Sequence, residues 1–341
     1  MIHCKALRTF AGLTACWLGI NLHAQTWQRI TPNIPGALGG GNIGPMATDG
    51  QRLYVLGAKG VFMSGDGGNS FSAINSVPGA AYSLDKYGHR FVGVANGLVW
   101  AGTDPGSAAL NDGLATLHRL TPGETTWTKS SAGFPTLTTG NQADDIAYDA
   151  TTGTYYVAAA LGGAFVSTDG INWEARNNGN GGLGLPATVE TINGVAFMVR
   201  PLAGINKTTD RGLTWTSTGA YPGLASSHLL ALNGRLMIAV NGPNLLLDGL
   251  YFSDDLGVTW TFTQGLPGSY DLTTDGNLIF AAGGGRPTRF SATSGLTWDN
   301  LPLSGVASGF SATRFVKVGN NLFLVGANNS PVSPFTSTPE L

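Results

Sequence analysis

The sequence predicts an all-β fold built from repeated antiparallel strands, and three observations lead to this prediction. Of the 341 residues, 51 are glycine and only 11% are charged, a composition that suits short strands joined by tight turns. A short turn motif containing Asp and Gly recurs along the chain. The aromatic residues that end this motif stand at 71, 127, 173, 215, 260 and 298, a spacing of about 45 residues that is typical of repeat arrays.

The recurring motif has the form S/T-x-D-x-G-x-x-W/F. Three segments match it fully and three are degenerate: Ser64–Phe71, Thr208–Trp215 and Ser253–Trp260, then Ser167–Trp173 (one residue shorter), Ser291–Trp298 (Thr293 in place of Asp) and Thr121–Trp127 (frame and aromatic only). The Asp and Ser/Thr side chains can accept hydrogen bonds from nearby main-chain N–H groups, and Gly takes the positive φ of such a turn. The motif is therefore expected to be structural, with Asp66, Asp169, Asp210 and Asp255 closing turns and Trp173, Trp215, Trp260 and Trp298 opening the next strand towards the core.

The rest of each repeat predicts three further strands. Asp-Gly or Asn-Gly pairs at 49, 193, 233 and 275 are strong hairpin signals, and each is followed by an apolar strand. A third strand then leads into the turn motif, and the aromatic residue opens a fourth. Four antiparallel strands per repeat form one blade of a β-propeller.

The two ends of the chain predict how the ring closes. Six repeats are complete, residues 313–338 supply three more strands, and residues 26–30 supply the missing fourth. Joining the ends gives a β-propeller of seven four-stranded blades, with the N-terminal strand closing the ring and no open edge left. A six-bladed ring with loose ends is the alternative.

The first 24 residues are typical of an export signal. Basic residues precede an apolar stretch, and Leu22-His23-Ala24 resembles a cleavage site. Residues 25–341 then form a single domain, secreted or periplasmic. A lipoprotein signal at Cys16 is the alternative, and without lipidation there no membrane association is expected. Both cysteines lie in this leader, which excludes disulfides and thiolate metal sites from the mature chain.

Composition also limits the partners. The formal net charge is -2 and the basic residues are scattered singly, so no nucleic-acid partner is expected. The sequence has no H-E-x-x-H, P-loop or G-x-S-x-G motif, and no cofactor or metal site is predicted. The domain is expected to be a monomer.

The turn motifs resemble those of the Asp-box, or bacterial neuraminidase repeat, propellers. That superfamily includes sialidases, xyloglucan-cleaving glycosidases, sortilin-type receptors and a photosystem II assembly factor, so the resemblance implies a fold and leaves activity open. The segment Arg29-Ile30-Thr31-Pro32 has one residue more than the Arg-Ile-Pro motif of sialidases. The mature chain also has only four Glu residues, at 124, 174, 190 and 340. Both departures argue against sialidase activity.

Alignment of the inner strands on their turns predicts which residues ring the channel mouth. Five residues before each turn stand Gly44, Tyr82, Asp144, Thr188, His228, Tyr270 and Arg314. This column mixes an acid, a base, an imidazole and two phenols in a sequence poor in ionisable groups. It is interpreted either as a hydrated channel rim or as a ligand-binding ring.

The column three residues before each turn is apolar except for Glu190. Its other members are Met46, Leu84, Ile146, Leu230, Leu272 and Val316. A carboxylate at a packed position needs a partner, and a structural ion pair with Arg200 is one interpretation. The other is a functional carboxylate, because Asp145 and Asp271 stand beside the ring and two such groups could act as general acid and base on a glycoside.

Polar loops are expected on the same face. They include an insertion at residues 102–116, a segment beginning at Arg176, Asn241–Asn244 and a loop that contains Arg286. Ordinary turn chemistry explains each loop singly. Their shared face favours a non-catalytic exported propeller that binds a carbohydrate or protein, or serves as a scaffold. The alternative is a sialidase- or xyloglucanase-like glycoside hydrolase that uses Glu190 with Asp144, Asp145 or Asp271.

Overall fold

The computed structural model describes the strands of the domain and the turns that join many of them. The described residues are 27–30, 46–57, 60–77, 88–104, 117–134, 143–159, 163–180, 188–200, 204–218, 225–226, 229–241, 249–263, 266, 271–283, 287–305, 311–327 and 335–337. Every regular element within these ranges is a β-strand, and none of the described residues forms a helix.

The described strands form seven antiparallel sheets, numbered here as blades in chain order. Blade 1 contains β2 (Met46–Thr48), β3 (Leu53–Gly57), β4 (Gly60–Ser64) and β5 (Ser72–Ala73). Blade 2 contains β6 (Gly88–Ala95), β7 (Leu98–Asp104), β8 (Leu117–Leu120) and β9 (Thr128–Lys129). Blade 3 contains β10 (Ala143–Asp149), β11 (Thr154–Ala159), β12 (Gly163–Ser167) and β13 (Glu174–Ala175). Blade 4 contains β14 (Thr188–Ile192), β15 (Val195–Arg200), β16 (Gly204–Thr208) and β17 (Thr216–Ser217).

The remaining three blades complete the ring. In blade 5, β18 (Ala225–Ser226) and β19 (Leu230–Leu232) both pair with β20 (Arg235–Asn241), which is followed by β21 (Gly249–Ser253) and β22 (Thr261–Thr263). Blade 6 contains β23 (Asp271–Asp275), β24 (Leu278–Ala282), β25 (Arg289–Ser291) and β26 (Asp299–Asn300). Blade 7 contains β27 (Ser311–Val318), β28 (Asn321–Ala327), β29 (Phe335–Ser337) and the N-terminal β1 (Gln28–Arg29).

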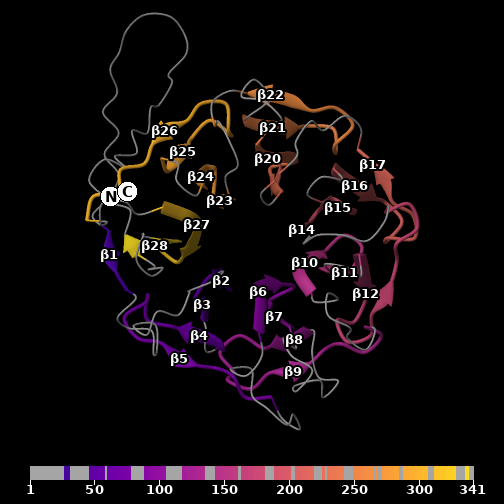
Figure 1. The fold of residues 1–341 in the computed structure, drawn as a ribbon, viewed down its shortest axis with the longest axis horizontal. Helices are drawn as coiled ribbons and strands as arrows, with labels where there is room; N and C mark the ends of the chain where they lie inside the picture. Colours follow the sequence, from indigo (N-terminus) through magenta and orange to yellow (C-terminus); the bar gives the residue numbers. More distant parts are fainter. Residues whose placement is uncertain are drawn as a thin grey trace, which may run out of the picture.

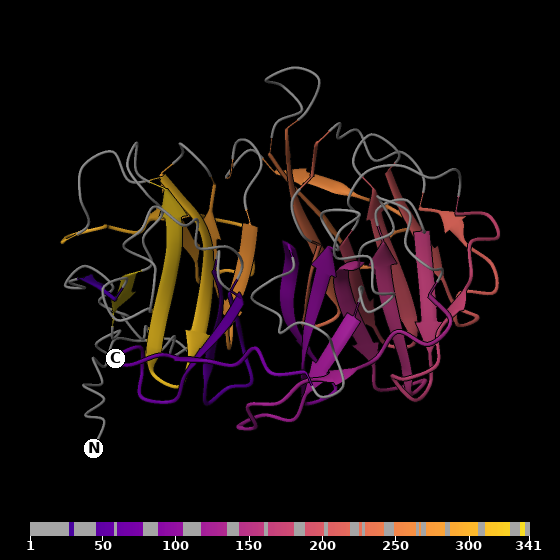
Figure 2. The ribbon, with the colours of Figure 1, turned by 60° about the horizontal axis from the view of Figure 1, so that its bottom comes forward.

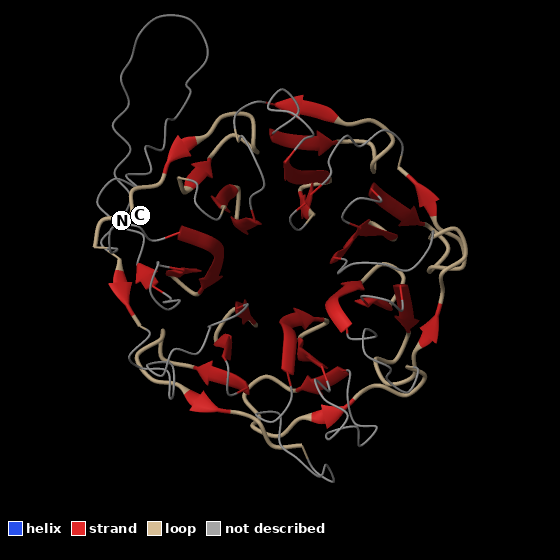
Figure 3. Cartoon of the chain, in the orientation of Figure 1, coloured by secondary structure: helices blue, strands red, loops and turns tan. Residues whose placement is uncertain are grey.

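The blades stand around a common axis, each with its first strand innermost (Figures 1 and 3). Seen from the side, the inner strands run along this axis (Figure 2). The predicted closure is confirmed, because β1 pairs antiparallel with β29, with Gln28 opposite Thr336 and Arg29 opposite Phe335. The two ends of the chain therefore share one blade, and Arg29 lies on its outermost strand.

The core lies between the blades. The described buried residues form seven apolar clusters, and each cluster joins two neighbouring blades. One of them packs Phe323 and Val325 of blade 7 against Leu53 and Val55 of blade 1, so it closes the circle. Burying one such side chain contributes about 1.5–3 kcal/mol, which makes the faces between blades the main source of stability.

The turn motifs close hydrogen-bonded turns between the third and fourth strands of their blades. We call the segments Ser64–Phe71, Ser167–Trp173, Thr208–Trp215 and Ser253–Trp260 the aspartate turns. In the first, the Ser64 hydroxyl donates to Asp66 at 2.8 Å and accepts the Gly68 amide at 2.8 Å, and Asp66 accepts the Ser70 amide at 2.9 Å.

The same contacts recur in the other three aspartate turns. Hydrogen bonds from the Ser70 side chain and main chain hold the pKa of Asp66 at about 2. Gly68 has a φ of +87°, as the turn requires. Because strands alternate in direction, these turns lie at the end of the ring where the inner strands finish.

The inner strand of blade 2 is where the sequence alignment was wrong. Tyr82 and Leu84 were placed on this strand, but the strand is β6 and it begins at Gly88. The hairpin turn that follows is Asn96-Gly97, with φ values of +50° and +69°. Positive φ at both positions is the signature of the two-residue hairpin turn that Asn-Gly favours. Because Tyr82 was counted five residues before the turn, the alignment placed that turn at residue 87, and so it shifted the blade by one strand.

Several predicted features lie outside the described residues. They are the export signal at residues 1–24 with Cys16, and the mouth residues Gly44, Tyr82, His228 and Tyr270. Most of the 102–116 insertion and the loop that contains Arg286 also lie there. Within the described part of the chain, no helix has the length and apolar character needed to span a membrane.

Candidate functional site

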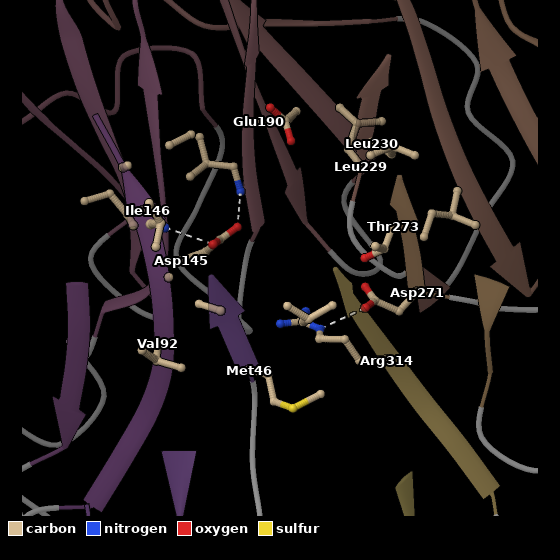
Figure 4. Close-up of a pocket in the computed structure, with 18 of the residues that line it drawn as sticks. Met46, Val92, Asp145, Ile146, Glu190, Leu229, Leu230, Asp271, Thr273 and Arg314 are labelled. Carbon is tan, nitrogen blue, oxygen red and sulfur yellow. Dashed lines mark hydrogen bonds and ion pairs between the residues drawn. The ribbon is translucent and has the colours of Figure 1, made fainter. Parts of the chain in front are cut away.

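The candidate site is an open cavity of about 420 Å³ on the axis of the ring. The inner strands of all seven blades contribute to its wall. The described lining residues are Met46, Ala47, Val92, Gly93, Val94, Ala95, Asn96, Asp145, Ile146, Ala147, Tyr148, Val189, Glu190, Thr191, Leu229, Leu230, Asp271, Leu272, Thr273, Arg314, Phe315 and Val316. Figure 4 shows Asp145, Glu190, Asp271 and Arg314 among the aliphatic side chains that surround this space.

Asp145 joins the inner strands of blades 3 and 4. One carboxylate oxygen accepts the amide of Ile146 at 2.9 Å on its own strand, and the other accepts the amide of Val189 at 2.9 Å on β14. The side chain reaches the next blade because β10 has a bulge at Asp144, between the paired residues Ala143 and Asp145. A bulge redirects the side chains that follow it.

Arg314 and Asp271 form an ion pair between blades 7 and 6. The Arg314 Nε lies 2.8 Å from the Asp271 carboxylate, and the two side chains are 23% and 13% exposed. Burial alone lowers the pKa of Arg314, but the charge and hydrogen bond of Asp271 raise it, and so does the charge of Asp145. The net result is a pKa above its ordinary value. Arg314 is therefore charged, and it interacts electrostatically with Asp145 as well as with its own partner.

The junction of blades 3 and 4 and the junction of blades 6 and 7 each have a second contact further along the strands. The Thr191 hydroxyl donates to the carbonyl of Tyr148 at 3.0 Å, and the Thr273 hydroxyl donates to the carbonyl of Phe315 at 2.8 Å. The inner strands of neighbouring blades have no ladder between them, so side chains must satisfy these carbonyls. Polar contacts thus hold blades 3 and 4, and blades 6 and 7, together beside the cavity.

Glu190 lies on the wall of the cavity, and the expectation of a packed position is corrected. Its side chain is half-buried, and one oxygen accepts the amide of Thr191 at 2.9 Å. Met46, Ile146 and Val316 of the same column are buried, and all three line the cavity. Glu190 is therefore the carboxylate in an otherwise apolar layer of the wall.

The other described candidates lie outside the cavity wall. Asp144 and Thr188 are half-buried at the mouth ends of β10 and β14. Arg200 donates to the carbonyl of Asn180, and burial lowers its pKa. Arg176 pairs with Glu174 at 2.8 Å and donates to the carbonyl of Arg211 at 2.6 Å, in the aspartate turn of the next blade. Arg176 thus contacts the turn end of the ring, opposite to the mouth where the loops were predicted.

The residues brought together at the cavity are Asp145, Glu190, Asp271 and Arg314. Sequence reasoning had named all four, but it assigned Arg314 to the mouth ring and Asp271 to possible catalysis without pairing them. The sequence places Arg314 and Asp271 one column apart on the inner strands of adjacent blades, but this spacing does not show that their side chains meet. Among the described residues, no group of three or more His, Cys, Asp or Glu side chains is arranged to hold a metal ion.

The comparison with known proteins supports the propeller fold through similar solved structures and gives no match in sequence families. No family model matches this chain, and no curated protein matches it. Among solved structures, it is similar to YCF48 bound to a D1 peptide, with a TM-score of 0.65 and 17% identity over 94% of this chain and 98% of that one. YCF48 from Cyanidioschyzon merolae gives a TM-score of 0.60 and 16% identity over 93% of this chain and 100% of that one.

An enzyme is also among the similar structures. An ancestral GH74 enzyme gives a TM-score of 0.61 and 17% identity, over 88% of this chain and 48% of that one. Identities this low show the fold alone. The chain is a β-propeller, and the same architecture serves binding proteins and enzymes.

Proposed function

We propose that this chain is an exported, non-catalytic propeller of the Asp-box type that binds a protein or glycan ligand at the cavity on its axis. The observation that carries the proposal is the state of Asp145 and Asp271, two of the three carboxylates among the described lining residues. Both oxygens of Asp145 accept main-chain amides, and Asp271 is held by Arg314.

These contacts are unfavourable for glycoside hydrolysis. The reaction needs one carboxylic acid that keeps its proton and one carboxylate that is open to the sugar or to water. Amide donors and a guanidinium stabilise the ionised carboxylate, which is the opposite of what a general acid requires. Asp145 and Asp271 therefore fit the role of connectors between blades, and the cavity they line fits a binding site.

Known relatives in fold are compatible with binding. YCF48, solved with a D1 peptide, is a propeller of this fold in complex with a peptide. The periodic turn motifs support membership of the Asp-box propellers, and the hydrogen bonds of the aspartate turns agree with that resemblance. The leader at residues 1–24 supports export to the periplasm or the medium, with lipidation at Cys16 as the variant form.

The test compares hydrolysis with binding in the purified mature chain. Chromogenic glycosides, a sialoside and xyloglucan oligosaccharides should give no turnover above the blank. Glycan and peptide arrays should show ligands whose binding weakens in Glu190→Gln. Glu124→Gln is the matched control, because Glu124 is exposed in the turn between β8 and β9 and lies outside the cavity.

One result would replace the proposal with the hydrolase. It is turnover of a glycoside that Glu190→Gln abolishes and Glu124→Gln leaves intact. Absence of any ligand on either array, with the chain folded, would also count against a binding role.

A further inference from the structure

The described hairpins include a matched series of Asn-Gly turns. Asn96-Gly97, Asn193-Gly194 and Asn233-Gly234 connect the inner strands of blades 2, 4 and 5 to the next strand of the same blade. The φ of Asn is +50°, +52° and +52°, and that of Gly is +69°, +85° and +85°. All three Asn residues are exposed. Because the backbone is nearly the same in the three turns, their reactivity must differ through their contacts.

An Asn-Gly pair is prone to deamidation, because Gly has no Cβ to obstruct the approach of its nitrogen to the Asn side chain. The main-chain nitrogen of Gly attacks the side-chain carbonyl carbon of Asn, loses its proton and expels the Nδ2 group as ammonia. Water then opens the cyclic imide at either carbonyl and leaves aspartate or isoaspartate. The reaction needs an available amide nitrogen, a side chain that can turn towards it and a main chain that can rotate.

In blade 4 the attacking nitrogen is held. The Gly194 amide donates to the Asp149 carboxylate at 2.8 Å, and the same carboxylate accepts the amide and hydroxyl of Thr152. Asp149 is only 3% exposed, so water has little access to this hydrogen bond. A hydrogen bond to a charged group is among the stronger ones in proteins, and it must break before the Gly194 nitrogen can attack.

In blade 2 the asparagine side chain is held. The Asn96 Nδ2 donates to the Tyr155 hydroxyl of blade 3 at 2.7 Å, and Tyr155 is buried. Asn96 also follows the eight-residue strand β6, in which Phe91 and Val92 are buried. Opening this turn would therefore disturb packed residues.

The turn in blade 5 is the least restrained of the three. The Asn233 Nδ2 donates to the Asn277 side chain at 3.2 Å, and both residues are exposed. Gly234 has open space around it, because a Cβ added there would have no atom within 4 Å. The inner strand of this hairpin, β19, has three residues, and all three are only half-buried. A hairpin with few buried contacts opens locally at low cost.

A fourth described Asn-Gly pair is fixed by the next blade. The Asn178 carbonyl accepts the Trp215 amide at 2.8 Å, and a Cβ added at Gly179 would lie 2.2 Å from the Trp215 carbonyl oxygen. The amide of Asn180 closes the turn by donating to the carbonyl of Asn177 at 2.9 Å. Cyclisation has to rotate the peptide between Asn178 and Gly179, and these contacts oppose that rotation.

We infer that Asn233 is a site of spontaneous deamidation in the folded chain, and that it reacts first among the described Asn-Gly pairs. The inference does not depend on the proposed binding function. Its product reaches the candidate site, because isoaspartate adds a carbon to the main chain of the turn that follows β19, and Leu230 of that strand lines the axial cavity.

The experiment follows deamidation residue by residue in the purified mature chain. The chain is incubated at mildly alkaline pH in water labelled with heavy oxygen, and its peptides are sequenced by tandem mass spectrometry. The label marks only the acids that form during the incubation. Asn233 should acquire it at least about tenfold faster than Asn193, as expected from the hydrogen bond that holds the Gly194 amide. It should also react faster than Asn96 and Asn178.

Two controls separate the fold from the local sequence. In urea the folded contacts are lost, so the four pairs should react at similar rates. In the folded chain, Gly234→Ala should suppress labelling at Asn233, because the added methyl group obstructs the attack, and it should leave Asn193 unchanged.

Equal rates at Asn193 and Asn233 in the folded chain, or faster labelling at Asn96 or Asn178, would overturn the inference. A preference for Asn233 that persists in urea would also overturn it, because the local sequence and not the fold would then be the cause.

Discussion

The closing strand offers the most direct test of how the ring is held together. Trp27 precedes β1 and is only 2% exposed. Its ring centroid lies 6.1 Å from that of Phe315, its indole N–H donates to the carbonyl of Pro302 at 3.1 Å, and its amide donates to the carbonyl of Ser304. Replacing Trp27 with Ala removes the side chain that fastens the N-terminal strand to blades 6 and 7.

The expected cost follows from this environment. Truncating a fully buried Trp to Ala costs about 3–5 kcal/mol, which includes the lost contacts and the cavity left behind. Because β1 has only two residues and lies at an outer edge, it can detach locally, and this places the value near the lower limit. We therefore expect Trp27→Ala to destabilise the domain by about 3 kcal/mol.

Urea unfolding followed by circular dichroism measures this cost without depending on tryptophan emission. Gln28→Ala is the matched control, since Gln28 is exposed on the same strand and should change stability by no more than about 0.5 kcal/mol. If Trp27→Ala and Gln28→Ala unfold at the same urea concentration, β1 does not hold the ring closed and the reasoning is refuted.

Three further predictions follow from the turns and the blade junctions. Gly179 and Gly234 both have a positive φ, of +78° and +85°. A Cβ added at Gly179 would lie 2.2 Å from the carbonyl oxygen of Trp215 in the next blade, whereas a Cβ added at Gly234 would have no atom within 4 Å. Gly234→Ala should cost about 1 kcal/mol for the backbone conformation, and Gly179→Ala about 1–3 kcal/mol more; equal urea midpoints would contradict this. Asp66, with a pKa of about 2, stabilises the fold above about pH 4, and this contribution should be lost as the pH falls towards 2. Asp66→Asn should flatten that part of the stability profile, and an unchanged slope would refute the assignment. Arg314→Met removes the cation beside Asp271 and should lower the free energy of unfolding by about 1–3 kcal/mol. The double variant Arg314→Met, Asp271→Leu should recover part of this stability. A double variant as unstable as Arg314→Met alone would contradict the ion-pair argument.

The candidate site was predictable in part. The alternation of inner strands identified Glu190 and Arg314, and both residues line the cavity. The burial of the column members was harder to predict, because a residue that faces the axis can be buried, like Met46, or half-buried, like Glu190. Periodicity gives the direction of a side chain and says nothing of the space in front of it.

Blade 2 shows the limit of turn signals. Its Asn96-Gly97 turn has the chemistry of the other hairpins, yet the alignment placed the turn at residue 87, one strand earlier. A shift of one strand changes which strand is innermost, and the sheet order β6-β7-β8-β9, with β6 at the end of the sheet, decides this. Local sequence specifies a turn, but long-range strand pairing selects among the turns that are available.

By itself, the sequence determined the repeat. The hairpin signals and apolar runs between successive turn motifs predict four strands in each blade. The unmatched strands at the two ends require one another, because an open sheet edge is unfavourable. The four-stranded blade follows from short-range signals within one repeat, and the closure follows from counting the strands at the two ends of the chain. The tertiary structure alone decided the partners of the axial charges, since Asp145 with Val189 and Arg314 with Asp271 meet across blade junctions about 43 residues apart in sequence. Such pairs form only when the ring curves and brings neighbouring inner strands together, and no local pattern records that curvature.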